Sequence, residues 1–274
     1  MIFHIDGASG YAYTAGKSFN PTLPTFVFIH GAQNDHSVWA GQSRYFAHHG
    51  VNVLAVDLPG HGRSTGPALH SVEVMAAWLI ALLDAAGAAK AVLIGHSMGS
   101  LIALEAAHQA PARVTALAML GTTYPMKVSD ALLTTARENE PAAIDMVNMF
   151  SHAGAATFQP QNPHAPLAGV STMGVARRLM QRMSARNPDQ LFYTDFNACN
   201  AYANGETAAL SLTCPVRFVF GAKDMMTPAR STKLLTSAVA SSRTVMVDAG
   251  HALMVEQPDA VLDALIGFAK EVNN

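Results

Sequence analysis

The chain has 274 residues, of which half are hydrophobic and 13% are charged, and its net charge is −2 with histidine neutral. This composition is typical of one large globular domain, or of a core domain that carries an insertion, and it excludes a disordered chain. The sequence has neither the basic run expected of a nucleic-acid-binding protein nor a stretch of about 18 apolar residues that would predict a membrane span.

Short β-branched and aromatic runs alternate with longer helical segments in the first half of the chain. Helices with apolar residues at helical spacing separate the runs, and Ser71 is the expected N-cap of the first of them. Strands are expected at 25–29, 52–56, 91–94 and 114–120, and helices at 71–86 and 101–109. This alternation predicts an α/β fold with a mostly parallel sheet and helices on both faces.

The alternation stops after residue 121 and resumes near residue 212. The intervening segment, 122–211, has no convincing strand; it has helical pieces separated by loops that contain Pro and Gly, such as Gln159–Pro163. Helices are expected there at 130–139, 142–151, 175–184 and 189–201. Strands follow at 216–220 and 244–247, with helices after Pro228 and at 258–272. We therefore expect a core of residues 1–121 and 212–274 and a helical cap, or lid, of residues 122–211.

The motif Gly95-His96-Ser97-Met98-Gly99 lies between an expected strand and an expected helix. This is the context of a nucleophile elbow, in which a tight turn exposes the serine hydroxyl and the flanking positions have no room for side chains. The turn also places the Met98 N–H at a helix N-terminus, where it can stabilise an oxyanion. The motif predicts Ser97 as a catalytic nucleophile.

A serine nucleophile needs a general base and an acid that orients it. His251 follows the strand at 244–247, and Asp224 follows the strand at 216–220. Both therefore lie at the carboxyl edge of the sheet, where Ser97 also lies. We expect His251 as the base and Asp224 as the acid; Asp248 is the alternative acid, but its position three residues before His251 favours a turn.

The loop after the first expected strand is the place for a second oxyanion donor. The backbone N–H of Ala32 is the first choice and that of Gln33 is the alternative, with Met98 as the other donor. His30 is expected to have a structural role, through hydrogen bonds to the loop backbone.

Together these motifs resemble the alpha/beta-hydrolase superfamily, in its cap-bearing branch of small bacterial esterases and related enzymes. The resemblance rests on His30-Gly31, Asp57-Leu58-Pro59-Gly60-His61-Gly62-Arg63-Ser64, the elbow, Gly221 to Asp224 with Pro228, and Gly250-His251 with Glu256 and Pro258. It implies a sheet of roughly eight strands, a helical cap over the site, and an acyl-enzyme route that needs no metal and no organic cofactor. Haloalkane dehalogenases and epoxide hydrolases of this fold use an aspartate at the elbow, so Ser97 argues against both.

The cap sequence does not identify the substrate. The methionines of the cap either pack in the interior of the lid or line an adaptable apolar pocket. Its arginines either lie on a solvated helix face or bind a carboxylate group of the substrate. The methionines are Met126, Met146, Met149, Met173, Met180 and Met183; the arginines are Arg177, Arg178, Arg182 and Arg186; the candidate pocket aromatics are Phe150, Phe158, Phe192, Tyr193 and Phe196. We expect a small-molecule substrate with an apolar part, and no nucleic-acid or membrane partner.

Three functions stay open at this point. The first is hydrolysis of a small or medium carboxylic ester. The second keeps the same triad for hydrolysis of a carbon–carbon bond, a thioester or a lactone, or for perhydrolysis. The third is a ligand-binding protein with slow turnover, because some relatives are receptors that retain the triad. The first residues have no signal-peptide layout, and Cys199 and Cys214 make no disulfide framework, so we expect a cytoplasmic protein.

Overall fold

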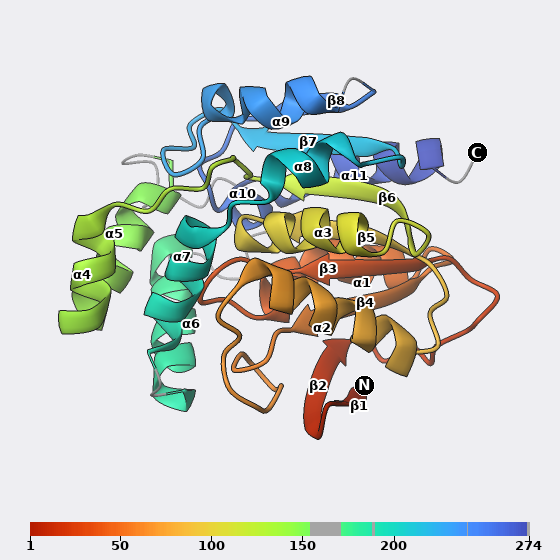
Figure 1. Ribbon diagram of the computed structural model, residues 1–274, viewed down its shortest axis with the longest axis horizontal. Helices are drawn as coiled ribbons and strands as arrows, with labels where there is room; N and C mark the ends of the chain where they lie inside the picture. Colours follow the sequence, from red (N-terminus) through yellow and green to blue (C-terminus); the bar gives the residue numbers. More distant parts are fainter. Residues whose placement is uncertain (154–170, 188–189, 240, 273–274) are drawn as a thin grey trace.

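One eight-stranded sheet runs through the computed structural model, which describes residues 1–153, 171–187, 190–239 and 241–272. The strand order is β1-β2-β4-β3-β5-β6-β7-β8 (Figure 1). The strands are β1 (Ile2–Ile5), β2 (Ala8–Tyr13), β3 (Thr25–Ile29), β4 (Asn52–Asp57), β5 (Ala91–His96), β6 (Val114–Leu120), β7 (Val216–Gly221) and β8 (Arg243–Val247).

Adjacent strands from β4 to β8 in this order are parallel. Every residue of β3, β4, β5 and β7 is buried, which is why most of their positions are apolar and polar and apolar residues do not alternate along them. The predicted α/β class and the mostly parallel sheet are confirmed.

The hairpin of β1 and β2 was not predicted from the sequence. The two strands pair in antiparallel register, with Ile5 opposite Ala8, and β2 also runs antiparallel to β4. Asp6 and Gly7 form the two-residue turn, and both have positive φ angles, 48° and 80°. Asp-Gly is a strong hairpin signal, but β2 is rich in Ala, Ser and Gly and therefore lacks the β-branched pattern of a strand.

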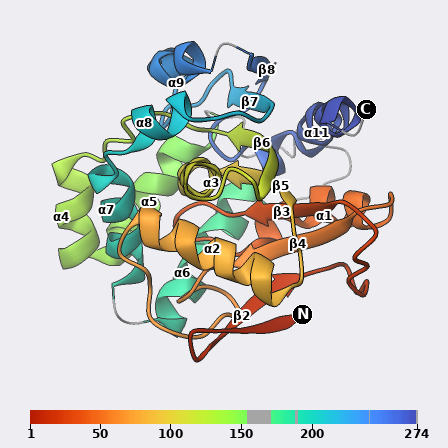
Figure 2. The ribbon, with the colours of Figure 1, turned by 45° about the vertical axis from the view of Figure 1, so that its right-hand side comes forward.

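Helices cover both faces of the sheet. α2 (Val72–Ala85) and α3 (Met98–Gln109) pack on one face, and α1 (Ala40–Ala47) and α11 (Pro258–Val272) pack together on the other (Figures 1 and 2). The predicted N-cap Ser71 accepts a hydrogen bond from the Val74 N–H. The shorter helices are η1 (His36–Trp39), η3 (Ala229–Thr232), α9 (Lys233–Ala238) and α10 (Leu253–Glu256).

Helices α4 to α8 connect β6 to β7, and α4 to α7 lie beyond one end of the sheet (Figure 1). They are α4 (Asp130–Glu138), α5 (Glu140–Ser151), α6 (Thr172–Arg186), α7 (Leu191–Ala201) and α8 (Gly205–Leu210). Gln159–Pro163 and Phe158 lie outside the described residues. Among the residues that are described, no helix is both long enough and apolar enough to cross a membrane.

Candidate active site

Ser97 occupies the turn between β5 and α3. Its backbone has φ 52° and ψ −122°, a region that non-glycine residues rarely adopt. The Ser97 N–H donates to the Leu120 carbonyl oxygen at 2.9 Å, and the Ser97 carbonyl oxygen accepts from the Ser100 N–H at 2.8 Å. The surrounding structure therefore holds a strained conformation of the kind that occurs at functional sites.

The two glycines of the elbow are required by close backbone contacts. A Cβ atom on Gly95 would lie 2.1 Å from the Gly99 carbonyl oxygen, and one on Gly99 would lie 2.4 Å from the Ile29 carbonyl oxygen. No side chain fits at either position, because the start of α3 packs directly against β5 and β3. The Gly-x-Ser-x-Gly spacing is thus explained by packing.

Asp224 and His251 meet at the carboxyl edge of the sheet, after β7 and β8 respectively. Oδ2 of Asp224 lies 2.8 Å from Nδ1 of His251, and both side chains are buried. Asp248 points elsewhere: its Oδ1 pairs with Nζ of Lys223 at 2.8 Å, and its side chain is 71% exposed. Of the two candidate acids, Asp224 is the one that contacts the histidine.

Thr227 also contacts Asp224, and it was not predicted from the sequence. Its N–H donates to Oδ1 of Asp224 at 2.8 Å and its hydroxyl donates to Oδ2 at 2.7 Å. Burial alone would raise the pKa of the Asp224 carboxyl, but the charge and hydrogen bond of His251 and the hydrogen bonds of Thr227 lower it below its ordinary value. Asp224 is therefore ionised and accepts the Nδ1–H of His251. The Asp-x-x-Thr spacing is the signal that could have identified Thr227.

The loop that carries His251 is held by two buried side chains. Nε2 of His96 lies 2.9 Å from the His251 carbonyl oxygen, and Oε2 of Glu256 accepts from the Gly250 N–H at 3.3 Å. Burial, followed by the charge of His251, lowers the pKa of His96 to about 3, so His96 stays neutral and donates from Nε2. Glu256 also accepts from the Ala153 N–H at 3.0 Å, which joins this loop to the end of α5.

The loop after β3 passes against the elbow. A Cβ atom on Gly31 would lie 3.1 Å from Cβ of Ser97. Ala32 borders the same pocket as Ser97, whereas the Gln33 N–H already donates to Oδ2 of Asp195 at 2.7 Å. Of the two candidate oxyanion donors, the Gln33 N–H is thus already hydrogen-bonded to a side chain.

His30 supports this loop through the hydrogen bonds that the sequence analysis expected. Its Nδ1 lies 2.8 Å from the Gly31 carbonyl oxygen, and its Nε2 accepts from the Leu58 N–H at 3.2 Å. Burial is the main cause that lowers the pKa of His30 to about 4, and the charge of His61 is the second cause. His30 is neutral, with the proton on Nδ1, and it ties the loop after β3 to the loop after β4.

A buried pair links that second loop to the inserted helices. Nε2 of His61 lies 2.8 Å from Oδ2 of Asp195 on α7, and both side chains are almost completely inaccessible to solvent. Burial disfavours protonation of His61, but the Asp195 carboxylate outweighs it and raises the pKa of His61 above its ordinary value. Asp195 was not predicted from the sequence, because only the tertiary structure brings α7 to this position.

Ser97, His251 and Ala32 border one pocket of about 170 Å³. The core contributes three further residues after β7, and the inserted segment contributes the remaining walls. The lining is Ala32, Ser97, Met225, Met226, Thr227 and His251 from the core, and Met126, Lys127, Val128, Ser129, Leu132, Met146, Val147, Phe150, Phe196 and Cys199 from the segment between β6 and β7. Most of these side chains are apolar, so the pocket suits an apolar group next to Ser97.

The methionines and aromatics of the inserted segment divide between pocket and core. Met126, Met146, Phe150 and Phe196 border the pocket, as the pocket interpretation expected. Met180, Met183 and Phe192 are buried in the core, Met149 is 66% exposed, and Tyr193 lies under the Arg137 guanidinium. Arg177, Arg182 and Arg186 bind Asp145, Asp35 and the Gly62 carbonyl oxygen respectively, and none of the four arginines lines the pocket.

A larger hollow of about 280 Å³ lies at the amino ends of β3 and β4, with Lys17, His48 and Asn52 among its lining residues. It is at the opposite edge of the sheet from Ser97. Ligands in open α/β sheets bind at the carboxyl edge, so the smaller pocket is the candidate active site.

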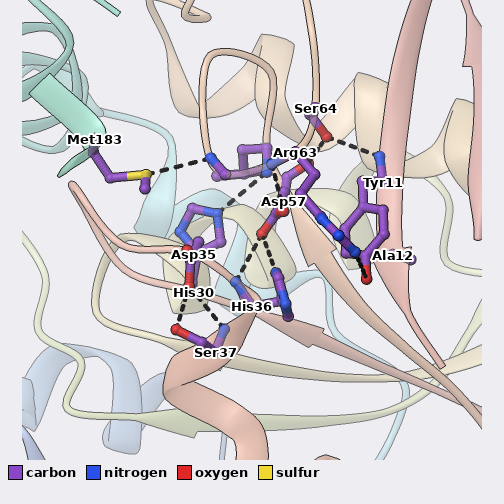
Figure 3. A network of polar contacts seen from close by, with 12 residues as sticks. Tyr11, Ala12, His30, Asp35, His36, Ser37, Asp57, Arg63, Ser64 and Met183 are labelled. Atoms are coloured by element: carbon purple, nitrogen blue, oxygen red, sulfur yellow. Dashed lines mark hydrogen bonds and ion pairs between the residues drawn. The ribbon is translucent and has the colours of Figure 1, made fainter. Parts of the chain in front are cut away.

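Asp35, His36 and Asp57 form a cluster of possible metal ligands, with one ligand atom of each within 4.8 Å of the others (Figure 3). The chain itself already engages these oxygens: Oδ1 of Asp57 pairs with Nδ1 of His36 at 2.8 Å, and Oδ2 accepts from the Arg63 N–H at 2.8 Å. Oδ1 of Asp35 accepts from the Ser37 N–H at 2.9 Å. We assign this cluster a structural role, which is to hold the loop after β4 against η1.

Comparisons with known proteins bear on the family. The model of the alpha/beta hydrolase fold family matches residues 24–258. "Putative carbamate hydrolase RutD" of Klebsiella pneumoniae is 26% identical over 269 residues, which cover 92% of this chain and 96% of that protein. The solved enol-lactonase from Burkholderia xenovorans has a TM-score of 0.83 at 21% identity, covering 98% of this chain and all of that one. A thermophilic esterase from Thermogutta terrifontis has a TM-score of 0.81 at 19% identity, covering 100% and 99%.

Proposed function

This chain belongs to the alpha/beta-hydrolase fold family of enzymes, and from that premise we propose that it is a serine hydrolase that cleaves a small or medium carboxylic ester through an acyl-enzyme. The observation that carries the proposal is the 2.8 Å contact between Asp224 and His251, beside the pocket that Ser97 also borders. The proposal includes the division into a core of residues 1–121 and 212–274 and a cap of residues 122–211.

In the first half of the reaction, the Ser97 hydroxyl attacks the ester carbonyl carbon while His251 takes its proton. Asp224 is ionised, so it holds the Nδ1–H tautomer and stabilises the imidazolium that forms. The N–H groups of Ala32 and Met98 bind the oxyanion of the tetrahedral intermediate. The intermediate collapses when His251 returns the proton to the leaving alkoxide, which releases an alcohol and leaves Ser97 acylated.

In the second half, a water molecule attacks the acyl carbonyl carbon and His251 takes its proton. The second tetrahedral intermediate expels the Ser97 oxygen, which recovers the proton from His251. The products are a carboxylic acid and the free enzyme, so atoms and protons balance without a metal or an organic cofactor.

The walls of the pocket support an apolar acyl or alcohol part of limited size. Its volume of about 170 Å³ and its Met, Val, Leu and Phe side chains favour a short chain over a long one. Lactones and carbamates, which the names of relatives mention, contain acyl carbonyl groups open to the same attack. A first substrate panel should therefore contain short esters, lactones and carbamates.

The decisive experiment is intact mass after incubation with a fluorophosphonate, followed by mapping of the modified peptide. We expect a single adduct on Ser97 and none on Ser97→Ala, which should fold normally and lack ester hydrolysis. Near wild-type activity in Ser97→Ala would overturn the assignment. An adduct together with a single burst of a chromogenic ester that then stalls would favour the slow, receptor-like alternative.

A further inference from the structure

We propose that Asp195, on cap helix α7, is a positioning residue that holds the oxyanion loop by accepting the Gln33 N–H. Gln33 follows Ala32 directly, so fixing the Gln33 N–H fixes the Ala32–Gln33 peptide plane. Through the φ and ψ angles of Ala32, this restrains the preceding Gly31–Ala32 plane, which carries the Ala32 N–H. The inference rests on the proposed function, because it gives Asp195 a role only if the Ala32 N–H binds an oxyanion. Asp195 would act through the loop and not on the substrate.

The conformation of Gln33 shows why the loop needs contacts that stabilise it. Gln33 has φ 57°, in the left-handed region that non-glycine residues adopt at a cost of roughly 1 kcal/mol or more. Its N–H donates to Oδ2 of Asp195 at 2.7 Å. Its side chain is held as well, since Nε2 donates to Oγ of Ser184 at 2.7 Å and to the Met180 carbonyl oxygen at 3.2 Å. The residue next to Ala32 is therefore joined to both α6 and α7.

The charge of Asp195 makes this contact strong. The carboxylate is fully buried, and its Oδ2 accepts from both Gln33 and His61, while its Oδ1 has no partner within the described ranges. Both ring nitrogens of His61 face acceptor oxygens, because Nδ1 lies 3.1 Å from the Pro59 carbonyl oxygen and Nε2 lies 2.8 Å from Oδ2 of Asp195. This arrangement favours the protonated imidazole, whose charge compensates that of the carboxylate. A hydrogen bond to an ionised acceptor in a buried site is about twice as strong as one between neutral groups.

Helix α7 connects this contact to the acyl pocket. Phe196, the residue after Asp195, and Cys199, one turn later, both border the pocket beside Ser97. One rigid helix thus carries a wall of the pocket and the acceptor that holds the oxyanion loop. Donors must lie 2.7–3.1 Å from the developing oxyanion, and a misplacement of about 1 Å can cost roughly 10²-fold in rate.

The test compares Asp195→Ala with Asp195→Asn. The alanine variant loses the acceptor, whereas the asparagine variant keeps an oxygen at the position of Oδ2 and places its NH₂ group at that of Oδ1. With a short chromogenic ester we expect Asp195→Ala to lower kcat by about 10- to 100-fold with KM changed less than about twofold. We expect Asp195→Asn to keep kcat within about fivefold of wild type. Asp145→Ala is the control, because it removes an exposed cap carboxylate that pairs with Arg177.

A boronic acid that forms an adduct with Ser97 gives a second readout. The adduct places a boron-bound oxygen in the oxyanion hole, so its Ki should rise in Asp195→Ala by about the same factor as kcat falls. A purely structural role would alter the thermal midpoint without this parallel. Asp195→Ser, whose hydroxyl is too short to replace Oδ2, takes the place of the alanine variant if that variant does not fold.

An unchanged kcat in a folded Asp195→Ala or Asp195→Ser variant would overturn the inference. A fall in kcat that Asp195→Asn shares to the same extent would also overturn it, because the acceptor would then not be the cause. Failure of the proposed function is distinguishable, since wild-type protein would in that case show no fluorophosphonate adduct on Ser97.

Discussion

The Asp224 carboxylate receives the Nδ1–H of His251 at 2.8 Å, although the two residues are 27 positions apart in the chain. Thr227 donates two further hydrogen bonds to the same carboxylate. The acceptor is therefore ionised and fixed in place before any substrate binds.

Replacement of Asp224 by asparagine should reduce kcat for ester hydrolysis by about 10³- to 10⁴-fold, because the amide no longer favours the Nδ1–H tautomer of His251. Steady-state kinetics with a chromogenic ester measures the effect. The matched control is Asp248→Asn, which removes an exposed carboxylate paired with Lys223 and should leave kcat unchanged. A larger loss in Asp248→Asn than in Asp224→Asn would mean that the wrong acid has been named.

Gly99→Ala should unfold the protein or lower its urea midpoint strongly, because the new Cβ would lie 2.4 Å from the Ile29 carbonyl oxygen. Gly267→Ala is the comparison: it lies within α11 and has no heavy atom within 4 Å of the added Cβ. Alanine should stabilise that helix by up to about 1 kcal/mol. Equal midpoints for the two variants would refute the packing explanation of the elbow.

Unfolding stability should fall as the pH drops below about 6.5, the ordinary histidine pKa. Burial lowers the pKa of His96 to about 3, so between these pH values the unfolded chain binds a proton that the folded chain does not. His30, with a pKa lowered to about 4, acts in the same direction, whereas His61, with a raised pKa, acts in the opposite one.

His96→Gln isolates one of these contributions. Its amide NH₂ can replace Nε2 as the donor to the His251 carbonyl oxygen, but it does not titrate. Urea unfolding at pH 7 and at pH 5 should show a smaller loss of stability for His96→Gln than for wild type, by about 2 kcal/mol. An identical pH dependence in the two proteins would show that folding does not lower the pKa of His96.

Met146→Phe should shift the preference of the enzyme toward shorter acyl chains, because Met146 borders the pocket and a phenyl ring would fill part of its roughly 170 Å³. The ratio of kcat/KM for a butyrate ester to that for an acetate ester measures this. Met149→Phe provides the control on the same helix, since Met149 is exposed and lies outside the pocket lining. If both variants changed the ratio equally, the pocket would not hold the acyl chain.

The main strands of the fold could be predicted because runs of apolar and β-branched residues indicate buried strands. The strand β3 is five consecutive apolar or β-branched residues, all of them buried, and the Gly-x-Ser-x-Gly motif identifies the turn after β5. The strands β1 and β2 could not be recognised by the same rule. β1 has only four residues, which alternate between exposed and buried, and the small residues Ala8, Ser9 and Gly10 of β2 form no β-branched pattern.

The sequence by itself determined the order of the parallel strands along the chain, the elbow at Ser97, and the positions of Asp224 and His251 after two later strands. Local patterns carry this information, because strand burial and tight turns constrain neighbouring residues. Only the tertiary structure decided that Asp195 binds Gln33 and which side chains of the segment between β6 and β7 border the pocket. These contacts join segments that no periodicity relates, and they depend on how the inserted helices pack against the end of the sheet.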